Sequence, residues 1–116
     1  GIKMKRIDVK IYLGLREGYS DQVHEIHEVY TVIQDYVNHA GLCVTVEPVK
    51  FIYTGGMEDG AIIGLINYPR FPTSEGELIS QATEIAKILK DTFKQKRVSI
   101  EWGDKIIMLG DENDEK

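Results

Sequence analysis

The sequence predicts a small α+β domain with the β-α-β-β-α-β order of ferredoxin-like folds, followed by one extra C-terminal strand. Three observations lead to this prediction. Residues 6–14 alternate between apolar and polar side chains, as in a strand with one buried face. Residues 21–40 and 74–94 carry apolar side chains at the spacing of amphipathic helices. The segments between and after these helices are typical of strands joined by glycine-containing turns.

The first half of the chain predicts a strand followed by a helix. The alternating residues of the strand are Ile7, Val9, Ile11 and Leu13. A loop follows, and we expect Ser20 or Asp21 to cap the helix, because their side chains can accept from free backbone N–H groups. Gly41 is expected to end that helix, since glycine readily adopts the left-handed conformation found there.

The middle of the chain predicts a hairpin and a second helix. Residues 42–54 are expected to form a strand that contains Pro48, and proline cannot donate to a sheet, so this strand is bulged or lies at an edge. A turn over residues 54–60 leads to a strand over residues 61–68. Ser74 then begins an S-x-x-E capping box, which predicts a helix running to about residue 94.

The last two expected strands are residues 98–102 and 105–109, joined by Gly103 and Asp104 in a type II′ turn. Two helices should then cover one face of an antiparallel sheet. The other face would stay open, and small domains often cover such a face by self-association. We therefore expect a homo-oligomer.

Composition bounds the function. The chain has 116 residues and a net charge of −5. We expect one ligand-binding domain over residues 1–110 and a disordered acidic tail over residues 111–116, which holds much of the excess negative charge. The body is close to neutral, which argues against DNA binding. No long apolar run occurs, so the sequence predicts no membrane segment. The single Cys43 is expected to be a buried free thiol in a reducing, intracellular compartment.

Catalytic and metal motifs are incomplete in the sequence. His24 and His27 lie three residues apart, but no third ligand is evident, so we expect exposed helical side chains and no metal. No serine lies in a G-x-S-x-G motif, and nothing places two carboxylates in a cleft. From these absences the sequence predicts a protein that is not an enzyme and has no cofactor.

A proline-bounded segment is the first candidate binding element. Between Asn67 and Pro72 the chain places Arg70 and Phe71 just before a helix N-terminus. Phe71 offers a ring that can stack on a base, and Arg70 offers a planar donor group for phosphate. Alternatively, Phe71 only closes the end of the sheet and Arg70 is solvated.

Three further residues are candidates. Arg97 opens a predicted strand, and Arg16 and Tyr19 lie in the first loop. Arginine, an aromatic ring and an amide together suit a nucleotide-like ligand. The alternative is that the cations of residues 94–97 only offset the negative end of the preceding helix dipole.

Residues 10–19 (KIYLGLREGY), 41–46 (GLCVTV) and 64–72 (GLINYPRFP) resemble the phage Thoeris anti-defence protein one family. The resemblance implies an oligomeric sponge in the host cytoplasm. Such a sponge binds a glycocyclic ADP-ribose signal without cleaving it and so keeps a defence effector off. Some members also hold cyclic oligonucleotides at a separate site. The resemblance assigns Phe71 and Arg97 to the signal, with Arg70 and Asn67 as neighbours.

Two other functions remain open. The chain could be an accessory domain that binds another protein through its open sheet face, or an enzyme acting on nucleotides. In the expected fold, Phe71 and Arg97 lie at opposite ends of the second helix, about 30 Å apart at about 1.5 Å per residue. We therefore expect a site shared between two subunits, each of which supplies one of the two residues.

Overall fold

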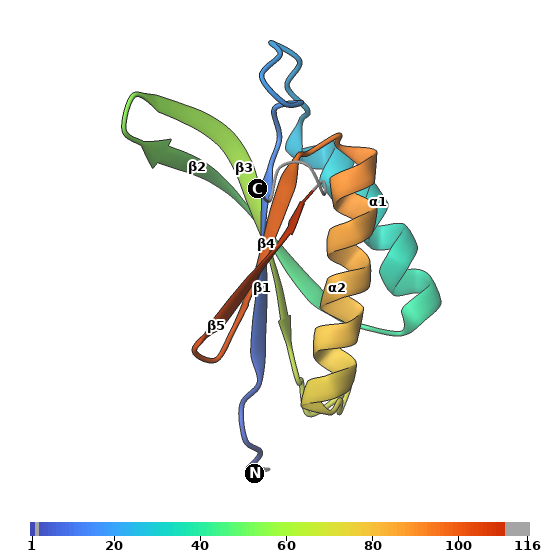
Figure 1. Ribbon diagram of the computed structural model, residues 1–116. Helices are drawn as coiled ribbons and strands as arrows, with labels where there is room; N and C mark the ends of the chain where they lie inside the picture. The colour runs from blue at the N-terminus through green and yellow to red at the C-terminus, as the bar shows by residue number, and fades with distance from the viewer. Residues whose placement is uncertain (2, 111–116) are drawn as a thin grey trace.

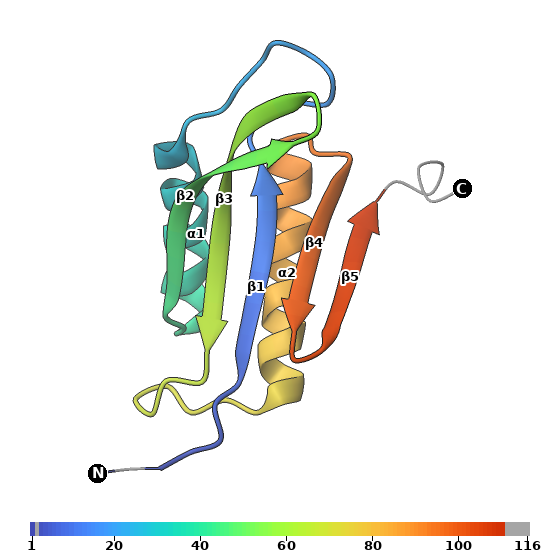
Figure 2. The same ribbon diagram turned by 90° about the vertical axis from the view of Figure 1, so that its left-hand side faces the viewer.

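The computed structural model describes residues 1 and 3–110, which form a five-stranded antiparallel sheet with two helices on one face (Figure 1). The elements are β1 (Asp8–Gly14), α1 (Ile26–Ala40), β2 (Val44–Tyr53), β3 (Gly56–Ile66), α2 (Glu75–Thr92), β4 (Arg97–Trp102) and β5 (Lys105–Gly110). The strand order β2-β3-β1-β4-β5 is ferredoxin-like, with β5 added at one edge (Figure 2). The predicted fold class is confirmed.

The core lies between the sheet and the helices. The period of two in β1 sends alternate residues toward α1 and α2, and Ile11 pairs with Ile63 on one side and Ile100 on the other, all three fully buried. The buried face of α2 consists of Leu78, Ala82, Ile85, Ala86 and Leu89. The opposite face of the sheet carries no helix (Figure 1).

The first helix begins five residues later than the sequence predicts, at Ile26. The Ser20 hydroxyl, expected to cap it, instead donates to the Glu17 carbonyl at 2.6 Å and accepts from the Gln22 N–H at 3.1 Å. A local turn thus uses the side chain that would have capped the helix. The cap is a Glu25–Glu28 capping box.

The β2–β3 hairpin is longer than expected, because β3 begins at Gly56 rather than near residue 61. Lys50 forms an ion pair with Asp59, its partner on the neighbouring strand, so charged side chains help to pair the two strands in the added part of the hairpin. The hairpin extends beyond the body of the sheet (Figures 1 and 2). β2 is an edge strand, as Pro48 predicts.

Cys43 is exposed, which corrects the expectation of a buried thiol. The neighbouring Leu42 is the residue that points into the core, so Cys43 faces solvent just before β2 begins. Among the described residues, no helix has the length and apolarity to cross a bilayer.

Candidate functional site

A pocket of about 200 Å³ lies at the end of the sheet where β1 ends and β4 begins. We call it the loop-end pocket. It is lined by Arg16, Gly18, Tyr19, Glu58, Gln95, Lys96 and Arg97. Three of the residues that the sequence singles out, Arg16, Tyr19 and Arg97, therefore come together in one place.

The first wall is the loop after β1. Arg16 and Val23 form a β-bridge, and the His24 N–H donates to the Leu15 carbonyl at 2.8 Å, so the loop closes on itself. Gly18 has a φ of +54°, a backbone conformation that glycine adopts without strain. Tyr19 projects from the loop with 90% of its surface exposed.

The second wall is the segment that joins α2 to β4. Lys94 adopts a φ of +51°, which turns the chain at the helix end and returns it toward the sheet. The Gln95 amide nitrogen donates to the Arg16 carbonyl at 2.7 Å and to the Phe93 carbonyl at 3.0 Å. Gln95 thus ties the second wall to the first.

Gly14, at the end of β1, lies against two of the residues that line the pocket, Gln95 and Glu58. A Cβ at this position would lie 2.8 Å from Gln95 Oε1 and 3.1 Å from Glu58 Oε1. Both acceptor oxygens therefore lie close above the Gly14 backbone. The Gln95 nitrogen donates to two carbonyls, so its oxygen is the end of the amide that lies beside Gly14. A cationic or hydrogen-donating group of a ligand would suit these two oxygens.

The pocket is electrostatically mixed. Arg16, Lys96 and Arg97 bring positive charge, and Glu58 brings negative charge. The Lys96 ammonium lies 5.5 Å from the centre of the Tyr19 ring, within range of a cation–π interaction. The arrangement can bind an anionic group, stack an aromatic ring and accept from a cationic group.

The other predicted residues lie at the opposite end of the sheet. β1 pairs with β3 from Gly14↔Gly60, beside the pocket, to Asp8↔Ile66, where the segment containing Phe71 begins. Phe71 is 38% exposed and Arg70 is exposed. Helix α2 has 18 residues and separates the two ends by about 27 Å.

Asn67 has a structural position at that far end. Its side chain is buried, accepts from the Ile7 N–H at 2.8 Å and donates to the Lys5 carbonyl at 2.7 Å. The amide therefore holds the N-terminal segment against the end of β3.

Three features of the site escaped sequence reasoning. Glu58 lies at the pocket because of the register of β3, and Gln95 because α2 ends just before it. No local sequence motif marks either position. His24, expected on an exposed helix face, instead precedes α1, and its side chain is only 14% exposed. No group of three side chains able to hold a metal occurs in the described part of the chain.

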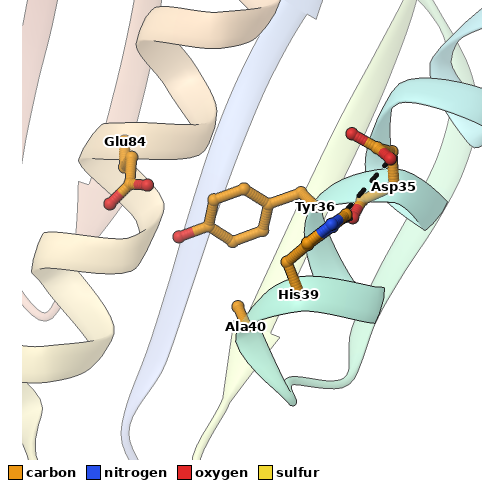
Figure 3. Close-up of a pocket in the computed structure, with 5 residues that line it drawn as sticks. All are labelled: Asp35, Tyr36, His39, Ala40 and Glu84. Atoms are coloured by element: carbon orange, nitrogen blue, oxygen red, sulfur yellow. Dashed lines mark hydrogen bonds and ion pairs between the residues drawn. The ribbon is translucent and has the colours of Figure 1, made fainter.

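A second pocket, of about 330 Å³, lies between the helices and is lined by Asp35, Tyr36, His39, Ala40 and Glu84 (Figure 3). Tyr36 points toward Glu84, and burial together with this carboxylate raises the tyrosine pKa. The carboxylates of Asp35 and Glu84 would repel an anionic ligand. The loop-end pocket is therefore the better candidate for a nucleotide-like molecule.

The sequence matches no protein-family model and no curated protein. Two solved structures have the same fold. A phage SAM lyase in complex with S-methyl-5′-thioadenosine superimposes with a TM-score of 0.72 at 17% identity, over 92% of this chain and 91% of that one. The apo state of a phage SAM lyase gives a TM-score of 0.72 at 17% identity, over 91% and 90% of the two chains.

The fold resembles that of a phage SAM lyase. At this level of identity the likeness establishes the fold alone. It nevertheless corrects the prediction that the chain is not an enzyme, because the structures that share its fold are those of an enzyme. The prediction was wrong to take missing nucleophile and metal motifs as grounds against catalysis.

Proposed function

We propose that the chain binds a small adenosine derivative of the S-adenosylmethionine (SAM) class in the loop-end pocket and breaks its carbon–sulfur bond. The observation that carries the proposal is the meeting of Arg16, Lys96 and Arg97 with the acceptor oxygens of Glu58 and Gln95 in one pocket. SAM itself joins a carboxylate to an ammonium and a sulfonium. The cations suit the carboxylate, and the acceptor oxygens suit the positive centres.

The chemistry of a sulfonium explains how such a pocket could act without a serine or cysteine nucleophile. When the bond from sulfur to the amino-acid side chain breaks, sulfur keeps the electron pair and leaves as neutral S-methyl-5′-thioadenosine. The carbon fragment can close a ring through its own carboxylate, or it can lose a proton to a base and become unsaturated. Glu58 is the carboxylate placed to stabilise the positive charge or to accept that proton.

Incubation of the purified protein with SAM, followed by mass spectrometry, tests the proposal. We expect S-methyl-5′-thioadenosine together with either the lactone or the unsaturated amino acid, and the second product identifies the route. Glu58→Gln should lower the rate, whereas Lys87→Ala, an exposed substitution on α2, should not. Intact SAM that also fails to raise the melting temperature would rule the proposal out.

A second candidate function is binding of a cyclic ADP-ribose-type nucleotide signal in the same pocket, in the setting of phage anti-defence. The cations that line the pocket favour it, since a pyrophosphate could contact Arg16 and Lys96 together. Calorimetry with cyclic ADP-ribose isomers and cyclic oligonucleotides tests it directly. Binding of these nucleotides with no binding of SAM would favour the second candidate over the first.

The size of the pocket supports self-association. Its volume of about 200 Å³ is below the roughly 300–1,000 Å³ of ligand sites that enclose a small molecule. A SAM-sized ligand would therefore protrude and could contact a second copy. The open sheet face adds apolar surface through Ile62, Ile106 and Met108. Their cross-strand partners alternate with core residues, which places all three on the open face.

We expect light scattering to find a homo-oligomer at micromolar concentration, because self-association would cover this apolar surface and complete the pocket. Glu substitution of the exposed Ile106 should shift the mass toward the monomer, and Glu substitution of the exposed Lys87 should leave it unchanged. A wild-type monomer would contradict the prediction and favour the sheet face as a surface for another protein.

A further inference from the structure

The His24 ring connects three elements around the loop-end pocket. Its Nε2 lies 2.6 Å from Glu17 Oε2 in the first loop, and its Nδ1 lies 3.1 Å from Glu28 Oε1 in the first turn of α1. The ring packs edge-on against Phe93 at the end of α2, with 5.0 Å between ring centres. The Glu17 carboxylate is two residues from Tyr19, and Phe93 immediately precedes the second wall.

We propose that His24 is a positioning residue that, as an imidazolium, clamps the first loop to α1 and to the end of α2 and so holds the two walls of the loop-end pocket in place. An imidazolium donates from both ring nitrogens, one to each carboxylate. A neutral ring donates from only one nitrogen. The other nitrogen is then an acceptor that faces a carboxylate oxygen, which is also an acceptor, so no hydrogen bond forms between them. Loss of the proton therefore releases one side of the clamp.

The surroundings of His24 favour the charged form. Burial lowers its pKa, but the hydrogen bonds and charges of Glu28 and Glu17 outweigh burial, and the pKa of His24 is raised. Phe93 brings no charge from α2. Two further carboxylates share a groove with His24: Asp59 is paired with Lys50, and Glu25 lies 3.1 Å from the His27 ring. No other titratable group of the described residues accounts for the raised value.

The sign of the pH effect follows from the two shifted groups. A raised histidine pKa means that the clamp is complete below the ordinary value of about 6.5 and is lost as the pH rises through the folded value. The pKa of Glu28 is lowered, first by the hydrogen bond from the Glu25 backbone and then by His24. The clamp is therefore also lost in acid, as the pH falls through the lowered pKa of Glu28.

The clamp can be tested without any ligand. NMR should show the His24 ring titrating above the ordinary histidine value, and the amides of residues 17–23 should lose exchange protection, corrected for intrinsic rates, over the same pH range. In His24→Gln the protection should be low and independent of pH. His39→Gln is the matched control, because that ring is 80% exposed in the last turn of α1. Wild-type protection that does not change with pH would overturn the proposal.

The functional readout rests on the proposed ligand site and uses S-adenosylhomocysteine, which has no sulfonium leaving group and no group that titrates near neutrality. Wild-type affinity should fall as the pH rises through the His24 titration, by at most the roughly ten- to hundredfold that one charge-assisted hydrogen bond is worth. Glu17→Gln, which keeps a hydrogen-bonding side chain without its charge, should flatten the profile and serves if His24→Gln does not fold. An unchanged profile in both variants would overturn the clamp. Failure of the probe to bind would count against the SAM-class ligand, and the exchange experiment would then decide on the clamp alone.

Discussion

Replacing Arg97 with alanine is expected to weaken ligand binding about ten- to a hundredfold, and replacing Phe71 with alanine is expected to do the same. Arg97 would lose a charge-assisted contact of about 1.5–3 kcal/mol. Phe71 would lose stacking of about 1–3 kcal/mol per base. The two residues lie at opposite ends of α2 within one chain. Both can contact one small ligand only if different subunits supply them.

The shared site predicts complementation. In a mixture of the Arg97→Ala and Phe71→Ala proteins, some interfaces combine one intact Arg97 with one intact Phe71, so calorimetry should detect a recovered class of tight sites. The matched control mixes Arg97→Ala with the Arg97→Ala/Phe71→Ala double variant, which can form no intact site. Confirmed subunit exchange without recovery would exclude the shared site and leave the loop-end pocket of a single chain as the whole site.

Gly60→Ala is expected to destabilise the fold by about 3 kcal/mol, at the upper end of the usual cost of overpacking. The added Cβ would lie 2.1 Å from the Phe51 ring and 2.7 Å from the Leu13 carbonyl oxygen. The ring could swing away at the cost of its packing. The carbonyl belongs to β1 in the centre of the sheet and can move only if the β1–β3 pairing is disturbed.

Urea denaturation measures this loss, and Gly14→Ala provides the contrast. The Cβ at Gly14 would meet only the side-chain ends of Gln95 and Glu58, which can shift without moving a strand, at the cost of the Gln95 hydrogen bonds to the Arg16 and Phe93 carbonyls. We expect Gly14→Ala to unfold near the wild-type midpoint but to bind ligand poorly, because the two acceptor oxygens are displaced. The double variant Phe51→Leu/Gly60→Ala should recover only part of the stability, since the Leu13 contact remains. Equal stability of Gly60→Ala and wild type would refute the close packing at this point.

Local patterns in the sequence were sufficient to predict the fold class. The alternation in residues 6–14 specifies β1, because only a strand places every second side chain on one face. The S-x-x-E box at Ser74 marks the start of α2 within one residue, since the Ser74 hydroxyl accepts from the Glu77 N–H at 3.2 Å. Pro48 marks an edge strand because it has no N–H to donate. Each of these features depends on neighbours a few residues away.

The start of α1 could not be read correctly in the same way. Serine is equally suited to a turn and to a helix cap. Ser20 forms a turn here because it bonds with Glu17 and Gln22, inside a loop that the Arg16–Val23 bridge closes. His24 became a partly buried link for the same reason, because its partners Glu17 and Phe93 belong to a loop and a helix that meet only in the folded chain.

Arg16, Tyr19 and Arg97 are recognisable in the sequence as candidates for an anionic ligand, because their chemistry is local. Their convergence was decided by tertiary structure. Placing β4 beside β1 brings the end of one strand next to the start of another 83 residues later, counted from Gly14 to Arg97. The same strand order sends Asn67, Arg70 and Phe71 to the opposite end. Sheet order is set by the burial of whole apolar faces, a property of the complete chain that no segment carries by itself.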